Sequence, residues 1–251
     1  KQVEAAHPDW VTPDSPSQRA GSAPAERFNK VPHPRPVLSL ANAFGAAEAR
    51  QWFERIRKLD DRVEQAGFVV EPKIDGLSVI LHYQAGIFVQ GATRGDGEVG
   101  EDITANLRTI KAIPLRIPVG GEAPGKPRLD LPASLVVRGE VFMHLSDFEA
   151  LNRRLEENGE KTYLNPRNTA AGSLRQHDPV ISASRPLTLL VYQGIHAQGG
   201  QVPGSQWELL AWLKALVFPV TDVARRCATL EDALAYTETF ATRRDELPFE
   251  A

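Results

Sequence analysis

The residues best suited to chemistry form the run Glu71-Pro72-Lys73-Ile74-Asp75-Gly76, which lies between two β-prone stretches. A lysine amine is a nucleophile only when it is uncharged, and a free lysine, with a pKa of about 10.4, is almost fully protonated at neutral pH. Desolvation or nearby cations would lower the pKa of Lys73, whereas Glu71 and Asp75 would raise it. The two carboxylates therefore need another role or must neutralise a cation. A surface lysine paired with Glu71 at a strand end is the simpler interpretation.

Three further segments carry charged side chains that suit phosphate and ribose binding, and they span 93–97, 137–142 and 165–176. Arginine forks such as that of Arg94 bind phosphate oxygens in pairs, and a carboxylate such as Glu140 can accept hydrogen bonds from two ribose hydroxyls. Asp75 or Glu140 could also hold a magnesium ion through water. Each segment has a structural interpretation too: a glycine-rich turn around Arg94 and Asp96, an exposed strand carboxylate, and a turn before a helix whose end Arg175 stabilises.

Short strands must position these residues. Runs rich in β-branched and aromatic residues predict strands over 68–70, 77–83, 87–90, 135–143 and 187–195. The connection Gln84-Ala85-Gly86 predicts a tight hairpin between the second and third of these strands. The Gly- and Pro-rich stretch 120–132 predicts a surface loop.

Helices are predicted from apolar spacing and from start and stop signals. Apolar residues at helical spacing predict a helix over 46–59, and 99–111 also has helical character. Capping-box spacing and terminal glycines predict further helices from Ser146 to Gly159, from Ser205 onward, and from Thr229 to about Arg244. Together the elements predict an α+β domain with antiparallel sheets flanked by helices.

The composition is that of an ordinary globular protein, because the 251 residues are 42% hydrophobic and 24% charged, with a formal net charge of −3. No apolar run approaches the roughly 18 residues of a membrane span, and no signal peptide is visible, which favours the cytoplasm.

Cys227 is the only cysteine, which excludes a disulfide framework and a cysteine-rich zinc site. No two histidines have metal-ligand spacing, so no protein metal site is predicted. The stretch 161–177 is modestly basic, with Lys161, Arg167 and Arg175 and no acidic residue.

Five segments, in the same order along the chain, resemble the motifs of NAD-dependent DNA ligases: 38–44, 71–76, 93–97, 137–142 and 165–176. The resemblance implies the nucleotidyltransferase fold of the ligase adenylation domain over 37–251. It implies that 1–36 is a linker and the remnant of the N-terminal region that captures NAD. The family's last two lysine motifs and its OB-fold, zinc-finger, helix-hairpin-helix and BRCT modules have no counterpart in the chain. We therefore expect this stretch alone to adenylate itself weakly or not at all, and not to seal nicks.

The resemblance also implies a role for each matching residue. Lys73 would attack the α-phosphorus of NAD, release nicotinamide mononucleotide and carry AMP. Glu71, Ser39 and Leu40 would lie against the adenine. Arg94 would contact the ribose and phosphate region of the nucleotide.

The remaining implied roles concern the ribose and the DNA. Glu140 would bind the ribose hydroxyls and help to orient the lysine. Arg167 and Arg175 match positions that the family uses at the DNA backbone and at the active-site edge. Supporting positions in the same motifs are Asp75, Gly76 and Asp96.

As such a ligase, the protein would seal nicked double-stranded DNA in replication and repair, as a monomer that uses NAD and Mg²⁺ and no membrane. Zinc would serve only in the family's zinc-finger module. An ATP-dependent ligase or a capping-type nucleotidyltransferase shares the lysine chemistry, but segments 38–40 and 165–176 favour the NAD-dependent class. A ligase-like module that binds nucleotide or nicked DNA without chemistry is the third interpretation. A module without catalytic activity would have no physical need of the set Glu71, Lys73, Arg94 and Glu140.

Overall fold

The chain divides into two compact units. The computed structural model describes residues 4, 6–19, 27–118 and 131–251. The large unit consists of Lys1–Val37, Ile74–Val220 and Pro248–Glu250. The small unit consists of Leu38–Lys73, Thr221–Leu247 and Ala251. Within the described ranges, no helix combines the length and the apolar character needed to cross a membrane.

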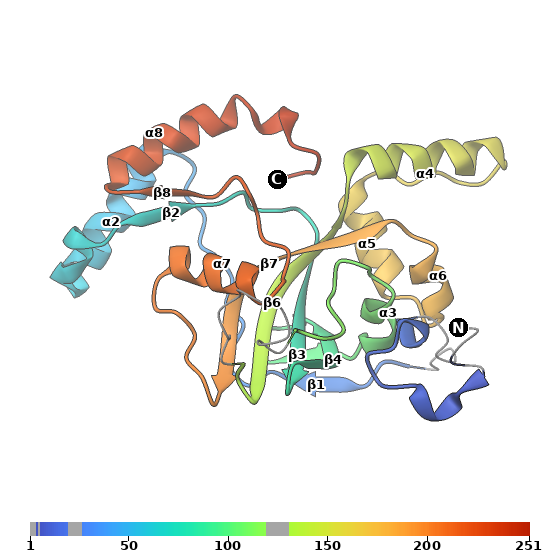
Figure 1. Cartoon of the computed structure of the whole chain (residues 1–251). Helices are drawn as coiled ribbons and strands as arrows, with labels where there is room; N and C mark the ends of the chain where they lie inside the picture. The colour runs from blue at the N-terminus through green and yellow to red at the C-terminus, as the bar shows by residue number, and fades with distance from the viewer. Residues whose placement is uncertain (1–3, 5, 20–26, 119–130) are drawn as a thin grey trace. The chain divides into compact units, whose positions relative to one another are not determined.

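An antiparallel four-stranded sheet forms the centre of the large unit, with its strands in the order β4-β3-β6-β7 (Figure 1). The strands are β3 (Leu77–Gln84), β4 (Ile87–Thr93), β6 (Ser134–Met143) and β7 (Leu187–Gln198). The hairpin between β3 and β4 turns at Ala85 and Gly86, whose φ angles are 46° and 77°. Positive φ at both loop residues is typical of a type I′ turn, whose twist matches that of the flanking strands.

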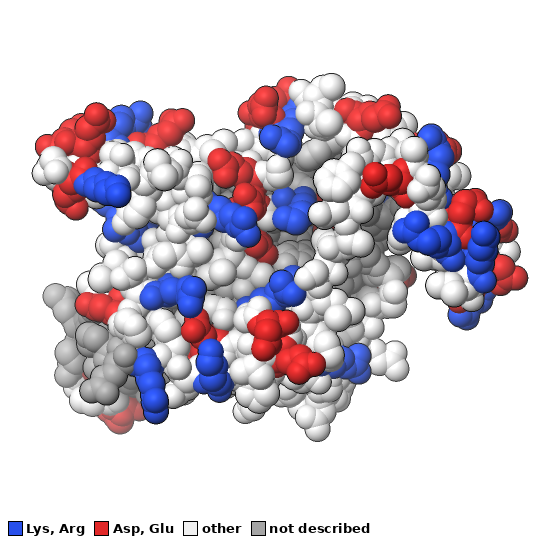
Figure 2. Space-filling model, turned by 180° about the vertical axis from the view of Figure 1, so that it is seen from behind, with Lys and Arg blue, Asp and Glu red and all other residues white. Residues whose placement is uncertain are grey.

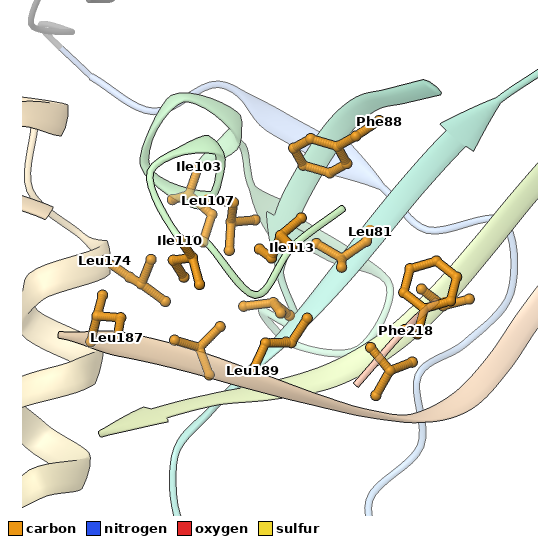
Figure 3. Close-up of a cluster of buried hydrophobic side chains, with 14 of the residues drawn as sticks. Leu81, Phe88, Ile103, Leu107, Ile110, Ile113, Leu174, Leu187, Leu189 and Phe218 are labelled. Carbon is orange, nitrogen blue, oxygen red and sulfur yellow. The ribbon is translucent and has the colours of Figure 1, made fainter. Parts of the chain in front are cut away.

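One face of this sheet is apolar. Side chains alternate between the two faces of a strand. Side chains at odd-numbered positions of β3 and β6, and of β7 up to Val191, enter the main core. They include Val79, Leu81, Val137, Val141, Leu189 and Val191. Figure 3 shows Leu81, Phe88, Leu107 and Leu189 converging from two strands of the hairpin, from the helix after it and from β7. The packing of these apolar side chains in the main core therefore holds the sheet in place.

The α-helices of the large unit pack around the same core, and α6 does so through two other helices. They are α3 (Thr104–Arg108), α4 (Leu145–Glu157), α5 (Pro166–Leu174), α6 (Pro179–Ala183) and α7 (Gln206–Ala215). Helix α5 contacts β6, α7 contacts β7, and α6 contacts α3 and α5. Their leucines Leu107, Leu151, Leu174 and Leu213 are buried in the main core. This packing fixes the strands whose opposite face carries the candidate site.

A smaller pairing in the large unit involves the N-terminal segment. Strand β1 (Lys30–Pro32) pairs antiparallel with β5 (Val99–Glu101). Two 3₁₀ helices, η1 (Pro8–Trp10) and η2 (Pro16–Arg19), precede β1. Arg19 donates hydrogen bonds to three backbone carbonyl oxygens in and after α3. The region predicted as a connecting segment therefore packs against the large unit, while the predicted boundary between 36 and 37 stays a prediction.

The small unit is built around one short strand pair. Its elements are α2 (Ala46–Leu59), η3 (Asp61–Gln65), β2 (Phe68–Val70), β8 (Arg225–Cys227), α8 (Leu230–Ala241) and η4 (Arg244–Glu246). Strands β2 and β8 are antiparallel, with Phe68 opposite Cys227, and α8 contacts both strands. Phe53 of α2 lies against Phe68, with ring centroids 5.8 Å apart.

Most predicted elements are confirmed, and so is the α+β class with antiparallel sheets flanked by helices. Helix 46–59 and strand 68–70 have the predicted bounds, and the four longer strands extend a little beyond theirs. Ser205 and Thr229 are N-caps, because their hydroxyls accept hydrogen bonds from the amides of Glu208 (3.3 Å) and Asp232 (3.1 Å). Gly159 follows α4 with a φ of 70°, a left-handed conformation that favours glycine.

The single helix predicted over 99–111 is wrong. Val99–Glu101 is strand β5, and only Thr104–Arg108 is α-helical. The partner strand β1 lies far away in the sequence, so the local pattern could not reveal it. Asp102 then turns the chain into the helix, because its carboxylate accepts a hydrogen bond from the amide of Thr104 (3.0 Å).

The capping box predicted at Ser146 is also wrong. Helix α4 begins at Leu145, and its N-cap His144 makes no side-chain capping bond. The amide of Leu145 instead donates to the carbonyl oxygen of Pro248 (2.9 Å), a residue from the other end of the chain. The last helix ends at Ala241, before the predicted Arg244. The predicted loop 120–132 lies, up to residue 130, outside the described residues.

Candidate functional site

Four polar side chains meet on the sheet face opposite the main core. Ser78 comes from β3, Arg138 and Glu140 from β6, and Tyr192 from β7. The antiparallel register puts Ser78 directly across from Glu140. The fold therefore groups Glu140, the predicted ribose ligand, with three residues from neighbouring strands.

Hydrogen bonds connect these four side chains. The Tyr192 hydroxyl donates to Oε2 of Glu140 (3.1 Å) and lies 3.3 Å from Oγ of Ser78. Nε of Arg138 donates to Oγ of Ser78 (2.9 Å), and its guanidinium lies 5.5 Å from the centre of the Tyr192 ring. Cation, hydroxyl, phenol and carboxylate thus form one connected polar network.

The phenol of Tyr192 keeps its proton throughout the neutral range. Burial raises the pKa of Tyr192 to about 12, and the negative charge of Glu140 acts in the same direction. The group therefore remains a hydrogen-bond donor to the carboxylate at physiological pH.

Gly76 of the lysine motif lies beside this network. A Cβ atom on Gly76 would lie 2.3 Å from the carbonyl oxygen of Val141 and 3.0 Å from Cγ of Glu140. No other residue fits between the two strands at this point without a backbone shift. The supporting role predicted for Gly76 therefore has a steric basis within the large unit.

Asp75 pairs with one of the two predicted DNA-contacting arginines. Nε of Arg167, in the first turn of α5, lies 3.2 Å from Oδ1 of Asp75. The N-cap Asn165 begins that helix by accepting a hydrogen bond from the amide of Asn168 (2.8 Å). The amide of Asp75 donates to the carbonyl oxygen of Glu250 (2.9 Å), so two distant segments hold the motif.

Arg94 follows β4 in a turn that the N-terminal segment clamps. Its Nε donates to the carbonyl oxygen of Val37 (3.1 Å), and its amide donates to that of Ser78 (3.1 Å). His33 reaches the same turn, with Nε2 3.0 Å from the carbonyl oxygen of Arg94. Asp96 accepts hydrogen bonds from two following amides, which lower the pKa of its carboxyl. The turn therefore holds Arg94 at the end of the strand next to β3.

Arg175, the second predicted DNA-contacting arginine, lies at the end of α5. Its Nη2 is 3.0 Å from Oε2 of Glu101, whose other oxygen is 3.8 Å from Nζ of Lys30. An open hollow of about 580 Å³ lies beside these residues, and His177 stacks on Phe28 at its wall, with ring centroids 4.9 Å apart. The structure thus brings Arg175 close to β1 and β5, and it does not bring Arg175 into the Glu140 network.

The other predicted site residues belong to the small unit. Lys73 and Ser39 are exposed, Leu40 is 77% exposed, and Glu71 is half-buried just after β2. The boundary between the units falls between Lys73 and Ile74, inside the lysine motif. The approach of these four residues to Glu140 stays a prediction.

Sequence reasoning missed Ser78, Tyr192 and His33 as members of the site. Arg138 and Glu140 are two residues apart, so both lie on one face of β6. Ser78 and Tyr192 are 114 positions apart in the sequence and meet only through strand pairing. No motif includes either of them, so no local pattern signalled the contact.

Neither the surface charge nor the potential metal ligands of the described residues single out one site. Figure 2 shows Lys and Arg interspersed with Asp and Glu over the face that it presents. In the part of the chain that the structure describes, no group of three or more His, Cys, Asp or Glu could hold a metal ion. Phosphate-bound Mg²⁺ needs only one or two protein carboxylates, and Asp75 and Glu140 are suitable donors of that kind.

Comparison with known proteins identifies the class and then the family. The antiparallel α+β fold, with a lysine motif leading into a central strand, is of the nucleotidyltransferase type. The model of the family described as NAD-dependent DNA ligase adenylation domain matches residues 25–251. The chain belongs to this family.

Three relatives illustrate the similarity. The DNA ligases of Chloroflexus aggregans and Roseiflexus castenholzii are 52% and 53% identical over 253 residues, and that of Shouchella clausii is 47% identical over 249 residues. The alignments cover 100%, 100% and 99% of this chain, but only 37%, 35% and 35% of the relatives. The chain thus spans little more than a third of the length of the curated relatives it matches.

Proposed function

We propose that the protein carrying this chain is an NAD-dependent DNA ligase and that Lys73 is the residue that receives AMP. The family match over 25–251 supports the class. The observation that carries the assignment of the site is the position of Glu140, because the β3–β6 register sets this carboxylate beside Gly76 of the lysine motif. Membership in the family alone would not link the two motifs physically.

The proposed first step is a nucleotidyl transfer. The uncharged Nζ of Lys73 forms a bond to the adenylyl phosphorus of NAD, and the bond from that phosphorus to nicotinamide mononucleotide breaks. The amine loses its proton, and the leaving group departs with the electron pair of the broken bond. Arg94 stabilises the developing negative charge, and Glu140 accepts hydrogen bonds from the ribose hydroxyls. Ser39, Leu40 and Glu71 contact the adenine.

The later steps use nicked DNA. AMP passes from Lys73 to the 5′-phosphate at the nick, and attack by the 3′-hydroxyl then seals the strand and releases AMP. Arg167 and Arg175 contact the DNA backbone. Both arginines pair with carboxylates in this structure, Asp75 and Glu101, and exposed pairs of this kind exchange readily for phosphate. With a net charge of −3, DNA binding by this stretch is weak and sensitive to salt.

Mg²⁺ is the metal that we propose for the reaction. When bound, it neutralises phosphate charge during the transfer. Asp75 and Glu140 would hold it through water, because Mg²⁺ prefers oxygen ligands and keeps several of its waters. The described residues include no group of three or more His, Cys, Asp or Glu that could enclose the ion directly. A cytoplasmic, monomeric enzyme of replication and repair remains our expectation from the sequence.

The test is adenylation of the full-length protein with NAD radiolabelled in its adenylate half. Lys73→Ala should reduce the covalent AMP adduct to background, whereas Lys58→Ala, an exposed lysine of α2, should leave it unchanged. Circular dichroism and thermal melting should show both variants folded like the wild type. A wild-type level of adduct in Lys73→Ala would overturn the assignment.

Replacing NAD with ATP in the same assay tests the cofactor. We expect adduct from NAD only. Efficient adduct formation from ATP would place the protein with the ATP-dependent nucleotidyltransferases. Tight nucleotide binding by calorimetry, without any adduct from either nucleotide, would instead indicate a non-catalytic module.

A further inference from the structure

Tyr192 occupies a special position in β7. In the pairing of β6 with β7, Arg138 is opposite Gln193 and Gly139 is opposite Val191, so Tyr192 is the extra residue of a β-bulge. A bulge leaves one residue without a partner and redirects its side chain, and bulges are frequent next to active sites. Here the redirected side chain reaches Glu140 of the neighbouring strand.

We propose that Tyr192 is a positioning residue for nucleotide binding, and that its hydroxyl, oriented by Ser78 and Arg138, fixes the carboxylate of Glu140 for the ribose hydroxyls. This inference rests on the proposed function of Glu140. It adds three residues to the site, Ser78, Arg138 and Tyr192, to which none of the ligase-like segments assigned a role. Arg138 and Glu140 lie in one of those segments, and Ser78 and Tyr192 lie in none.

The direction of each hydrogen bond follows from the number of protons available. Arg138 can only donate, so Oγ of Ser78 accepts from its Nε. The single hydroxyl proton of Tyr192 is used by Glu140. Ser78 must therefore donate its own proton to the Tyr192 oxygen, 3.3 Å away. All three bonds point from the cation toward the carboxylate, an arrangement in which each bond strengthens the next.

The network restricts the conformational freedom of the Glu140 side chain. A glutamate has three rotatable bonds, and an unrestrained carboxylate loses this freedom when it binds two hydroxyls. Tyr192 has only two rotatable bonds, is largely buried, and contacts the Arg138 guanidinium through its ring. A donor held in this way restricts the carboxylate before the nucleotide arrives. The high pKa of Tyr192 keeps the donor protonated over the working pH range.

The bond to Tyr192 uses only part of the hydrogen-bonding capacity of the Glu140 carboxylate. Tyr192 bonds to Oε2, and a carboxylate has about four lone-pair sites on two oxygens. Ribose hydroxyls can therefore bind without displacing the phenol. The network sets the direction of the carboxylate without consuming its capacity.

The experiment measures single-turnover adenylation of the full-length protein as a function of NAD concentration. Tyr192→Phe removes the hydroxyl and keeps the ring. We expect the NAD concentration at half-maximal rate to rise about tenfold, the order expected from losing one hydrogen bond to a charged acceptor. Ser78→Ala should give a smaller increase in the same direction, and Ser78→Thr, which keeps a hydroxyl, should restore most of the affinity.

Matched controls separate positioning from a general loss of structure. Tyr163→Phe removes another tyrosine hydroxyl of the large unit, one that accepts from Arg185 (3.0 Å), and should leave the NAD dependence unchanged. Thermal melting of each variant checks the fold. If Tyr192→Phe does not fold, Ser78→Ala and Ser78→Thr carry the test.

A double-mutant cycle supplies the readout that a merely structural role would not change. In a Glu140→Gln background, Tyr192→Phe should have almost no further effect on the NAD dependence. The penalty for an NAD analogue that lacks one adenosine ribose hydroxyl should also be smaller in Tyr192→Phe than in the wild type. Equal effects of Tyr192→Phe with and without the Glu140 carboxylate, or an unchanged ribose penalty, would overturn the proposal. If the wild type itself forms no adduct with NAD, the proposed function fails. If the wild type forms the adduct and Tyr192→Phe shows the same NAD dependence, only the inference about Tyr192 fails.

Discussion

The large and small units differ in how much apolar surface each one buries. In the large unit, strands and helices contribute to a continuous core in which Leu81, Phe88 and Leu189 are almost inaccessible to solvent. In the small unit, α2 has no buried residue, and among the described residues the buried apolar side chains are Cys227 and Ala233. Burial of apolar area is the dominant stabilising contribution to folding. We therefore expect the small unit to open locally at a lower free energy than the large unit.

The same difference separates the predicted site residues. Asp75, Arg94 and Glu140 lie in the well-packed unit, where strands, a clamped turn and ion pairs hold them. Lys73 and Glu71 lie in the less packed unit, just after a three-residue strand. Groups that stabilise charge need a fixed geometry, which a rigid scaffold supplies. The nucleophile is thus predicted to sit on the more easily opened part of the molecule.

The largest expected effect is on the core of the large unit. Leu189→Ala removes a side chain that is 1% exposed, and it should lower the free energy of unfolding by about 2–5 kcal/mol. Leu59→Ala, on a leucine of α2 that is 86% exposed, should change it by less than about 0.5 kcal/mol. Urea titrations followed by circular dichroism measure both. Similar losses in the two variants would contradict the expected difference between the two units.

A smaller effect is expected at the start of α8 in the small unit. Thr229→Ala removes the capping box with Asp232 and should destabilise α8 by about 0.5–2 kcal/mol. Hydrogen exchange resolved by residue should show faster exchange of the α8 amides and unchanged protection in β3 and β6. Thr239→Ala, inside the same helix, is the control and should not accelerate exchange. Loss of protection in β3 as well would mean that the units do not open separately.

The ion pair between Asp14 and Arg116 gives the large unit a dependence on acid pH. The hydrogen bond from Arg116 lowers the pKa of Asp14 to about 2, from an ordinary value of 3.8. A carboxyl whose pKa is lower in the folded state contributes stability above its unfolded pKa, and loses it as the pH falls through its folded pKa. Wild type should therefore be more stable than Asp14→Asn above about pH 4, and the gap should close as the pH falls to about 2. A gap that stays constant across this range would contradict the assignment.

The smallest effect is expected from the exposed pair in the small unit. Arg50 binds Glu231 through two hydrogen bonds of 2.8 and 2.6 Å, and this contact lowers the pKa of Glu231. Both side chains are well exposed, so water and salt screen the attraction. Glu231→Gln should give a barely measurable decrease in thermal stability at low salt and none at high salt. A large decrease that persists in high salt would show that this pair is a major support of the small unit.

Local patterns in the sequence determined much of the fold. Helix 46–59 follows from apolar spacing, the β3–β4 hairpin from its short Ala85-Gly86 turn, and the starts of α7 and α8 from the capping residues Ser205 and Thr229. Each of these signals acts over a few residues, so no tertiary contact is needed to read it. The helix predicted over 99–111 failed for the opposite reason, because β1 supplies the partner that makes Val99–Glu101 a strand.

Residue types and their spacing along the chain specify which side chains are available for chemistry: a lysine motif, an arginine in a glycine-rich turn, a strand carboxylate and two arginines around a helix. Their partners depend on the folded chain, which pairs Arg167 with Asp75, Arg175 with Glu101, and Glu140 with Tyr192. Strand pairing and helix packing bring together residues that are far apart in the sequence, such as Ser78 and Tyr192, which are 114 positions apart. The bulge at Tyr192 in β7 then decides where that side chain goes. No local pattern of residue types carries that information.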